Sequence, residues 1–167
     1  QIADGQAIIA AVGLPNITLK QLDILEFDKS FGTFDYIVIH GVYSWVSEVV
    51  REQLLNICQH HLAPQGVAYV SYNTYPGWYP NQMIRELMLY FHTQQFQEVR
   101  SIHPVETKQL LQLAVLLNQG QKDAFTLTLQ EQWERFQKTD VDNYLRHDLL
   151  ELTSQPVYFH QFIEHAR

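Results

Sequence analysis

The sequence predicts an α/β protein: a partial sheet of about three parallel strands with flanking helices, followed by an all-helical section. In the first half of the chain, apolar runs typical of strands alternate with segments of helical period. This alternation is typical of strand–helix–strand crossovers, which join parallel strands. From Trp78 onward only helical periodicity is found. A chain of 167 residues is also long enough to bury a hydrophobic core.

The first predicted elements are a helix and a short strand. Alanine and isoleucine residues at helical spacing predict a helix over residues 2–12, and Gly13 provides the stop signal. Apolar residues then alternate along 16–24, which predicts a short strand.

A strand–helix–strand unit follows. The continuous apolar run DYIVIHGV (35–42) predicts a strand that is covered on both faces. Ser47 can cap the next helix. That helix is expected to end at the sequence LAPQG, where Pro64 and Gly66 predict a turn before a third strand at 66–72.

The second half is predicted to be helical throughout. Apolar stripes at helical spacing predict helices at 83–96, 106–117, around 129–136, at 141–152 and after Pro156.

Composition limits the classes of function. The net charge is −7 and no cluster of lysine and arginine stands out, which argues against nucleic-acid binding. No apolar run approaches the roughly 18 residues of a membrane span. The single cysteine, Cys58, excludes an internal disulfide and fits a reducing compartment. With no visible signal peptide, we expect a cytoplasmic protein.

Polar and small residues follow the predicted strands. Asp23 follows the first strand, His40 and Gly41 follow the second, and Asn73 follows the third. Ligands of parallel α/β sheets bind at the carboxyl ends of the strands. We therefore expect these residues at one binding site, where Gly41 lets the backbone approach a ligand closely.

Large aromatic residues occupy the same two loops. The aromatic residues are Tyr43, Trp45, Tyr75 and Trp78, and the amide side chain of Asn73 lies among them in the sequence. The aromatic rings are suited to enclosing a substrate or a cationic ligand, or they pack beneath the helical section. The spacing leaves both interpretations open.

No histidine or cysteine spacing indicates a metal site, and no Gly-x-Ser-x-Gly motif indicates a hydrolase.

Three stretches in order resemble a known family. QLDILEF, FDYIVIHGVYSWV and HHLAPQGVAYVSY resemble the middle of a class I S-adenosylmethionine-dependent methyltransferase, over about residues 1–75. The runs HGVYSWV, VSYNTYPGW and PVYFHQF further resemble the bacterial subgroup in which a methyltransferase regulatory domain follows the methyltransferase domain.

The resemblance implies S-adenosylmethionine as cofactor and assigns roles to several residues. Asp23 corresponds to the residue that hydrogen-bonds the adenine amino group, and Ile24 to the one that packs on the adenine ring. His40 and Gly41 would line the cofactor pocket. The catalytic residue is unknown, with His40 and Tyr43 as candidates for a base. The acceptor is expected to be a small molecule or a protein side chain, bound among the aromatic residues.

The chain departs from the family at its beginning. The Gly-rich cofactor loop and the acidic residue that binds the ribose are absent. The chain is therefore expected to be an internal piece of a longer enzyme. Its expected parts are the C-terminal portion of a Rossmann-like core (1–77), a helical insertion or lid (78–152) and a helix returning to the core (153–167).

Two other functions stay open. The missing loop is compatible with a catalytically inactive binding or regulatory module that keeps half of the methyltransferase fold. Another Rossmann-like enzyme, such as a dehydrogenase, is a weaker alternative. Because open sheet edges tend to pair, association between copies of the chain is a further expectation.

Overall fold

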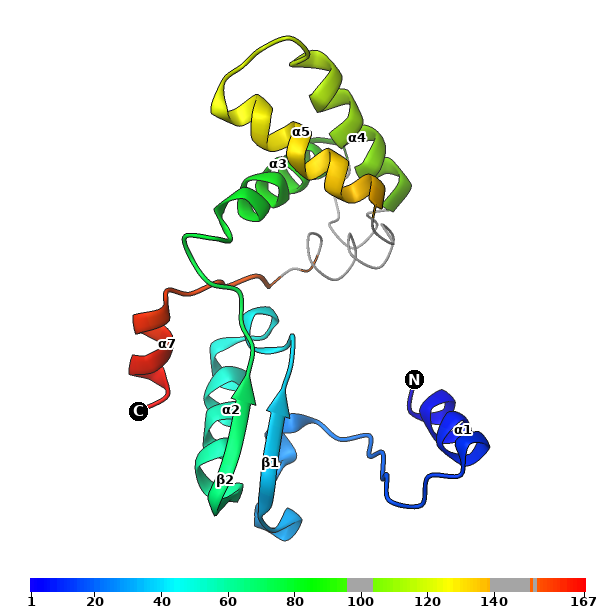
Figure 1. Ribbon diagram of the computed structural model, residues 1–167, viewed down its shortest axis with the longest axis vertical. Helices are drawn as coiled ribbons and strands as arrows, with labels where there is room; N and C mark the ends of the chain where they lie inside the picture. Colours follow the sequence, from blue (N-terminus) through cyan, green and yellow to red (C-terminus); the bar gives the residue numbers. More distant parts are fainter. Residues whose placement is uncertain (96–103, 139–150, 152) are drawn as a thin grey trace. The chain divides into compact units, whose positions relative to one another are not determined.

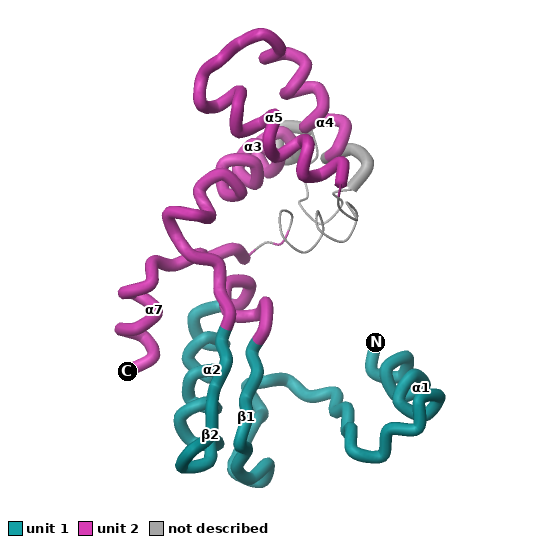
Figure 2. The backbone as a smooth tube through the Cα atoms, viewed as in Figure 1, with its two compact units in different colours: residues 1–39, 47–70 teal, residues 40–46, 71–167 magenta. Residues whose placement is uncertain are grey.

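The computed structural model describes residues 1–95, 104–138, 151 and 153–167 (Figure 1). The chain divides into two compact units, shown in Figure 2: unit 1 comprises residues 1–39 and 47–70, and unit 2 comprises residues 40–46 and 71–167. The boundaries expected from the sequence, at residues 77 and 152, stay a prediction.

Unit 1 is built on one strand–helix–strand crossover. Strands β1 (Phe34–Ile39) and β2 (Leu62–Val70) pair in parallel, and helix α2 (Glu48–His61) joins them (Figure 1). This confirms the predicted α/β class and the parallel pairing. Ser47 is the N-cap of α2, as predicted, although its side chain makes no capping hydrogen bond.

The two faces of the β1–β2 sheet differ in burial. Ile39, Leu54 and Ile57 are buried between β1 and α2. Successive side chains of a strand point to opposite faces, and those of the other face are open: Tyr36 is 76% exposed and Val38 is 69% exposed. The expectation of a strand covered on both faces is therefore not met within this unit.

The predicted strand at 16–24 is not a strand in the structure. Helix α1 (Ile2–Val12) ends at Gly13, which has the left-handed φ of 74° expected of a C-cap. The chain then runs unpaired until the 3₁₀ helix η1 (Ile24–Glu26). A strand needs a neighbour for its backbone hydrogen bonds, and within the described residues the sheet has two strands, β1 and β2, rather than about three.

The predicted turn at LAPQG is also a correction. Helix α2 ends at His61 and β2 begins at the next residue, so Pro64 and Gly66 lie inside the strand. The pairing jumps from Phe34–Leu62 to Tyr36–Val67, which leaves extra residues on β2. Proline and glycine are tolerated at such bulges because regular ladder hydrogen bonds are interrupted there.

Unit 2 contains the helical section and both loops that follow the strands. Its described helices are α3 (Tyr79–Gln95), α4 (Pro104–Leu117), α5 (Ala124–Lys138) and α7 (Phe159–His165), and it also contains the 3₁₀ helix η3 (Tyr43–Trp45). A further 3₁₀ helix, η2 (Lys29–Phe31), belongs to unit 1. A core of Ile84, Met88, Leu111, Ala114, Leu129 and Phe136 joins α3, α4 and α5. The helices predicted near 83–96, 106–117, 129–136 and after Pro156 are thus confirmed, and the one at 141–152 falls almost entirely outside the described residues.

The bulge in β2 generates a test of stability. A side-chain carbon at Gly66 would lie 2.9 Å from the backbone oxygen of Asp35 and 2.9 Å from the Leu62 side chain. Because backbone cannot easily move away, Gly66→Ala should lower the free energy of unfolding by about 1–3 kcal/mol, as other overpacked sites do. Urea unfolding measures this change.

Gly77→Ala is the matched control. The nearest atom to a side-chain carbon at Gly77 is the Thr74 oxygen at 3.6 Å, an ordinary contact. Equal losses in the two variants would contradict the close approach in the bulge.

Candidate ligand pocket after the two parallel strands

A pocket of 290 Å³ lies in unit 2 on the two loops that follow β1 and β2. Its lining combines hydroxyls, an imidazole, an amide and aromatic rings: His40, Gly41, Ser44, Trp45, Ser71, Tyr72 and Asn73. The structure thus brings together four of the residues predicted from the sequence, namely His40, Gly41, Trp45 and Asn73.

The Ser71 hydroxyl joins the two loops. The backbone N–H of Gly41 donates to Ser71 Oγ over 2.8 Å, and Ser71 Oγ lies 3.0 Å from His40 Nδ1. Gly41 has a φ of 67°, and no atom lies within 4 Å of the side-chain carbon it lacks. Glycine is therefore favoured here by the left-handed backbone, and not by close approach of another part of the protein.

The other side of the pocket is fixed by the segment before α7. Asn73 N–H donates to Ser44 Oγ over 2.8 Å, and the Ser44 carbonyl accepts from Gln155 N–H over 2.9 Å. The Asn73 carbonyl accepts a hydrogen bond from Val157 N–H over 3.1 Å. The Val157 carbonyl in turn accepts one from Tyr75 N–H, also over 3.1 Å. Gln155 therefore holds the loop after β1, and Val157 holds the loop after β2, by backbone hydrogen bonds.

Two side-chain donors at this loop lack partners within the described structure. Asn73 Nδ2 and Trp78 Nε1 are both buried and make no hydrogen bond. Buried polar groups nearly always have a partner, from protein, water or ligand. The amide of Asn73, a lining residue, is therefore suited to donating to an acceptor atom of a bound molecule. Trp78 itself packs edge-on against Trp45, with ring centroids 6.1 Å apart.

Tyr43 lies outside the pocket lining. It is 1% exposed, and its hydroxyl lies 2.7 Å from His165 Nδ1 of α7. Its ring contacts Phe162 edge-on, and Phe162 stacks on Tyr72 with centroids 4.2 Å apart. These contacts bury Tyr43 against α7. Both interpretations left open for the aromatic residues stay predictions. The role of Tyr43 toward a substrate or as a base stays a prediction.

Tyr75 belongs to a separate tyrosine cluster. Its ring stacks on Tyr79 at 4.5 Å, and the Tyr79 and Tyr158 hydroxyls are 2.7 Å apart. Burial, followed by the charges of Tyr79 and Glu86, raises the pKa of Tyr75. The hydrogen bond with Tyr79 raises the pKa of Tyr158.

The predicted adenine contacts lie in unit 1. Asp23 does not follow a strand, because it is the N-cap of η1, where its Oδ1 accepts from Leu25 N–H over 3.0 Å. Ile24 lines an apolar hollow of 260 Å³ with residues of β1 and α2, including Ile39 and Leu54. The contact of Asp23 and Ile24 with a cofactor stays a prediction.

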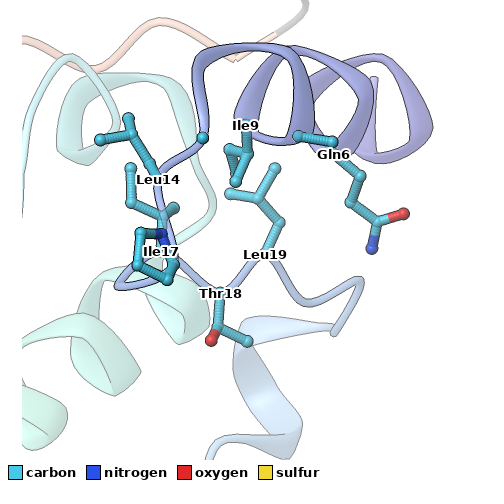
Figure 3. A pocket seen from close by; sticks show the side chains of 9 residues that line it. Gln6, Ile9, Leu14, Ile17, Thr18 and Leu19 are labelled. Carbon is cyan, nitrogen blue, oxygen red and sulfur yellow. The ribbon is translucent and has the colours of Figure 1, made fainter.

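A third hollow, of 520 Å³, lies beside α1 (Figure 3). Figure 3 shows Ile9, Leu14, Ile17 and Leu19 around it, and its lining contains no ionisable side chain. It therefore offers no group that transfers protons or binds charge.

Among the described residues, no three metal-ligating side chains come together, and no helix is long and apolar enough to cross a membrane.

Sequence reasoning missed Ser44, Ser71 and Tyr72 as pocket residues. Ser71 comes directly after β2, so the rule that placed His40 after β1 applied equally to it. Ser44 had no such signal, because its role depends on burial and on the turn of η3.

The Tyr43–His165 contact, which is buried on the Tyr43 side, generates a second test of stability. Tyr43→Phe removes a buried hydroxyl from its hydrogen bond with the His165 ring, so the free energy of unfolding should fall by about 1 kcal/mol. Tyr36→Phe is the control, because that hydroxyl belongs to a largely exposed side chain, and it should have almost no effect. Urea unfolding of both variants compares them, and equal losses would contradict a specific role for the Tyr43 hydroxyl.

Sequence comparison finds long matches in rickettsial proteins. No protein-family model matches the chain. The proteins RP789 and RP028 of Rickettsia prowazekii are each 38% identical over all 167 residues, which span 30% and 66% of their respective lengths. The protein sll1526 of Synechocystis is 32% identical over 89 residues, which are 53% of this chain and 18% of that protein.

Structure comparison identifies the fold. The structure of PKMT2 from Rickettsia typhi matches 99% of this chain with a TM-score of 0.80 and 36% identity, over 30% of its own length. The structure of the same protein in complex with AdoHcy matches with the same score and identity, over 31% of its length. The chain thus spans about a third of this solved relative. It carries part of an S-adenosylmethionine-dependent methyltransferase fold.

Proposed function

We propose that the chain is part of a methyltransferase that transfers the methyl group of S-adenosylmethionine to a lysine side chain of a protein. The observation that carries this proposal is the match, at 36% identity, to PKMT2 in complex with AdoHcy. PKMT2 is a protein lysine methyltransferase, and AdoHcy is the product that S-adenosylmethionine leaves after transfer. The match favours this function over a catalytically inactive module.

Four cofactor residues are proposed from the resemblance. Asp23 would accept a hydrogen bond from the adenine amino group, and Ile24 would contact the ring. His40 and Gly41, after β1, would line the part of the pocket that the cofactor enters. The sulfonium of the cofactor is already an activated leaving group, so these residues have to bind and orient it.

The acceptor would be held by the remaining pocket residues. Methyl transfer requires the nucleophile in line with the methyl carbon and sulfur, and such alignment supplies a large part of the rate enhancement. Trp45 offers an aromatic ring to the lysine side chain, and Asn73 offers a buried amide. A lysine amine, with an ordinary pKa of about 10.4, must also lose its proton before it attacks.

The charge of the chain supports a protein acceptor of basic character. The net charge of −7 attracts lysine-rich protein surfaces at long range and repels nucleic acid. The helical section would shape access to the acceptor, as lids do in other enzymes. The regulatory-domain subgroup, a cytoplasmic location and self-association belong to the same proposal.

Calorimetry with AdoHcy tests the cofactor part of the proposal. Because the chain spans about a third of PKMT2, the titration should use both this chain and a form extended to the length of its relatives. Tight binding by the longer form, with transfer of labelled methyl groups to lysine in a protein substrate, is the expected result. Absence of binding by both forms would contradict the proposal.

Asp23 provides a sharper test with a matched control. Asp23 and Asp28 each cap a 3₁₀ helix by accepting a backbone N–H, over 3.0 and 2.9 Å. Asp28 Oδ1 also accepts from the Ser30 hydroxyl over 2.6 Å, so removing the Asp28 carboxylate disturbs its own turn at least as much as removing that of Asp23. If Asp23 also contacts adenine, Asp23→Ala should lower the AdoHcy affinity of the longer form about tenfold more than Asp28→Ala does, the loss expected for one hydrogen bond. Equal affinities in the two variants would exclude the adenine contact.

A further inference from the structure

We propose that Phe162 of α7 is a positioning residue: by stacking on Tyr72 it fixes one wall of the pocket, and this wall holds the side chain of the acceptor lysine. The acceptor part of the inference rests on the proposed function. Its physical part depends on contacts within unit 2, between α7 and the two loops that follow β1 and β2.

Tyr72 contributes an aromatic ring to the pocket lining. Phe162 stacks on this ring, with the two ring centroids 4.2 Å apart and an angle of 23° between the ring planes. Both side chains are half-buried. The stack covers one face of the Tyr72 ring, so the other face, the ring edge and the hydroxyl are left for a ligand. The place of Phe162 therefore sets where this wall of the pocket lies.

Phe162 is itself held by a buried neighbour. Tyr43, which is 1% exposed, meets Phe162 edge-on with centroids 5.3 Å apart, and its ring centroid lies 5.9 Å from that of Tyr72. The Tyr43 hydroxyl lies 2.7 Å from Nδ1 of His165, three residues along α7 from Phe162. The three aromatic rings thus form one packed group, and close packing of this kind leaves little room for Phe162 to move.

The backbone beside Tyr72 is anchored independently of its ring. Val157 N–H donates to the Asn73 carbonyl over 3.1 Å, and Asn73 N–H donates to Ser44 Oγ over 2.8 Å. Because the main chain next to Tyr72 is held by these bonds, loss of the Phe162 ring would free mainly the side-chain torsions of Tyr72. Phe162 is therefore the group that determines the ring position.

A lysine side chain matches what this wall offers. Trp45 provides a second aromatic ring in the same lining. Aromatic rings contact the methylene chain of lysine with their apolar surface, and they attract an ammonium or methylated ammonium group through their quadrupole. Tyr72 precedes Asn73, which is proposed to face the acceptor. A wall fixed by Phe162 would keep the amine in line with the methyl carbon, and such alignment supplies much of the rate enhancement.

The first test follows the Tyr72 ring by NMR in this chain with ring-labelled tyrosine, and it needs neither cofactor nor substrate. A ring that stacks on another experiences its ring current, so the Tyr72 ring protons should be shifted upfield in the wild type. Phe162→Leu should lose this shift, and Phe162→Tyr, which keeps an aromatic ring, should retain it. The Tyr43 signals report whether α7 stays docked. Unchanged Tyr72 signals in Phe162→Leu would overturn the proposal.

Phe159→Leu is the matched control. Phe159 belongs to the same helix as Phe162, but its side chain is 67% exposed. The substitution should therefore leave the Tyr72 signals where they are in the wild type.

The second test measures methyl transfer by the form extended to the length of its relatives, with labelled S-adenosylmethionine and with polylysine as the acceptor probe. Phe162→Leu and Tyr72→Leu should each raise the KM for polylysine about tenfold and leave the KM for S-adenosylmethionine within about twofold. Because both substitutions act on one wall, the double variant should be no worse than either single variant. Phe162→Tyr should restore the wild-type KM, and Phe159→Leu should not change it.

Two kinetic results would contradict the positioning role. Additive losses in the double variant would mean that the two rings act independently, and equal increases in both KM values would mean general damage to the fold. A wild-type longer form that binds AdoHcy but methylates no lysine would contradict the acceptor role. Absence of AdoHcy binding would contradict the proposed function, and with it the acceptor role, whereas the NMR test decides on the Phe162–Tyr72 stack in either case.

Discussion

The parallel pairing of β1 with β2 is the constraint on which the candidate site depends. Because the strands run in the same direction, both loops that continue from them begin at the same end of the sheet. The last register pair joins Ile39 to Val70, and the next residues along the chain are His40 and Ser71. The register alone thus explains why the Ser71 hydroxyl meets both His40 and Gly41.

The bulge in β2 allows this register to exist. The sequence between α2 and the pairing of Tyr36 with Val67 is longer than a direct entry into the strand requires. The extra residues, Pro64 and Gly66 among them, are accommodated as an irregularity at the start of the strand. A regular ladder from Leu62 onward would shift the pairing along the strand and place a different residue beside His40. The irregularity at LAPQG therefore sets which residue of β2 pairs with Ile39.

The sequence predicted those features that follow from local pattern. The strand–helix–strand order, the C-cap at Gly13 and the helices around Ile84, Leu111 and Leu129 all follow from periodicity and stop signals. The predicted strand at 16–24 failed because alternation says nothing about whether a neighbouring strand exists. The turn at LAPQG failed for a related reason, since proline and glycine mark a bulge as well as a turn. Whether either residue ends an element depends on the partner strand.

The pocket was predictable in its position and not in its hydrogen bonding. The predicted strand ends were enough to place His40, Gly41 and Asn73 at one site. The hydrogen bonds from residues 155–157 were not predictable in this way, because that segment lies more than 80 positions further along the chain. That support has a chemical consequence. Because the backbone of Asn73 is bonded on both sides, its side-chain amide cannot gain a partner by a small shift of the loop. A buried N–H donor fixed in this way favours a ligand that brings an acceptor oxygen into the pocket.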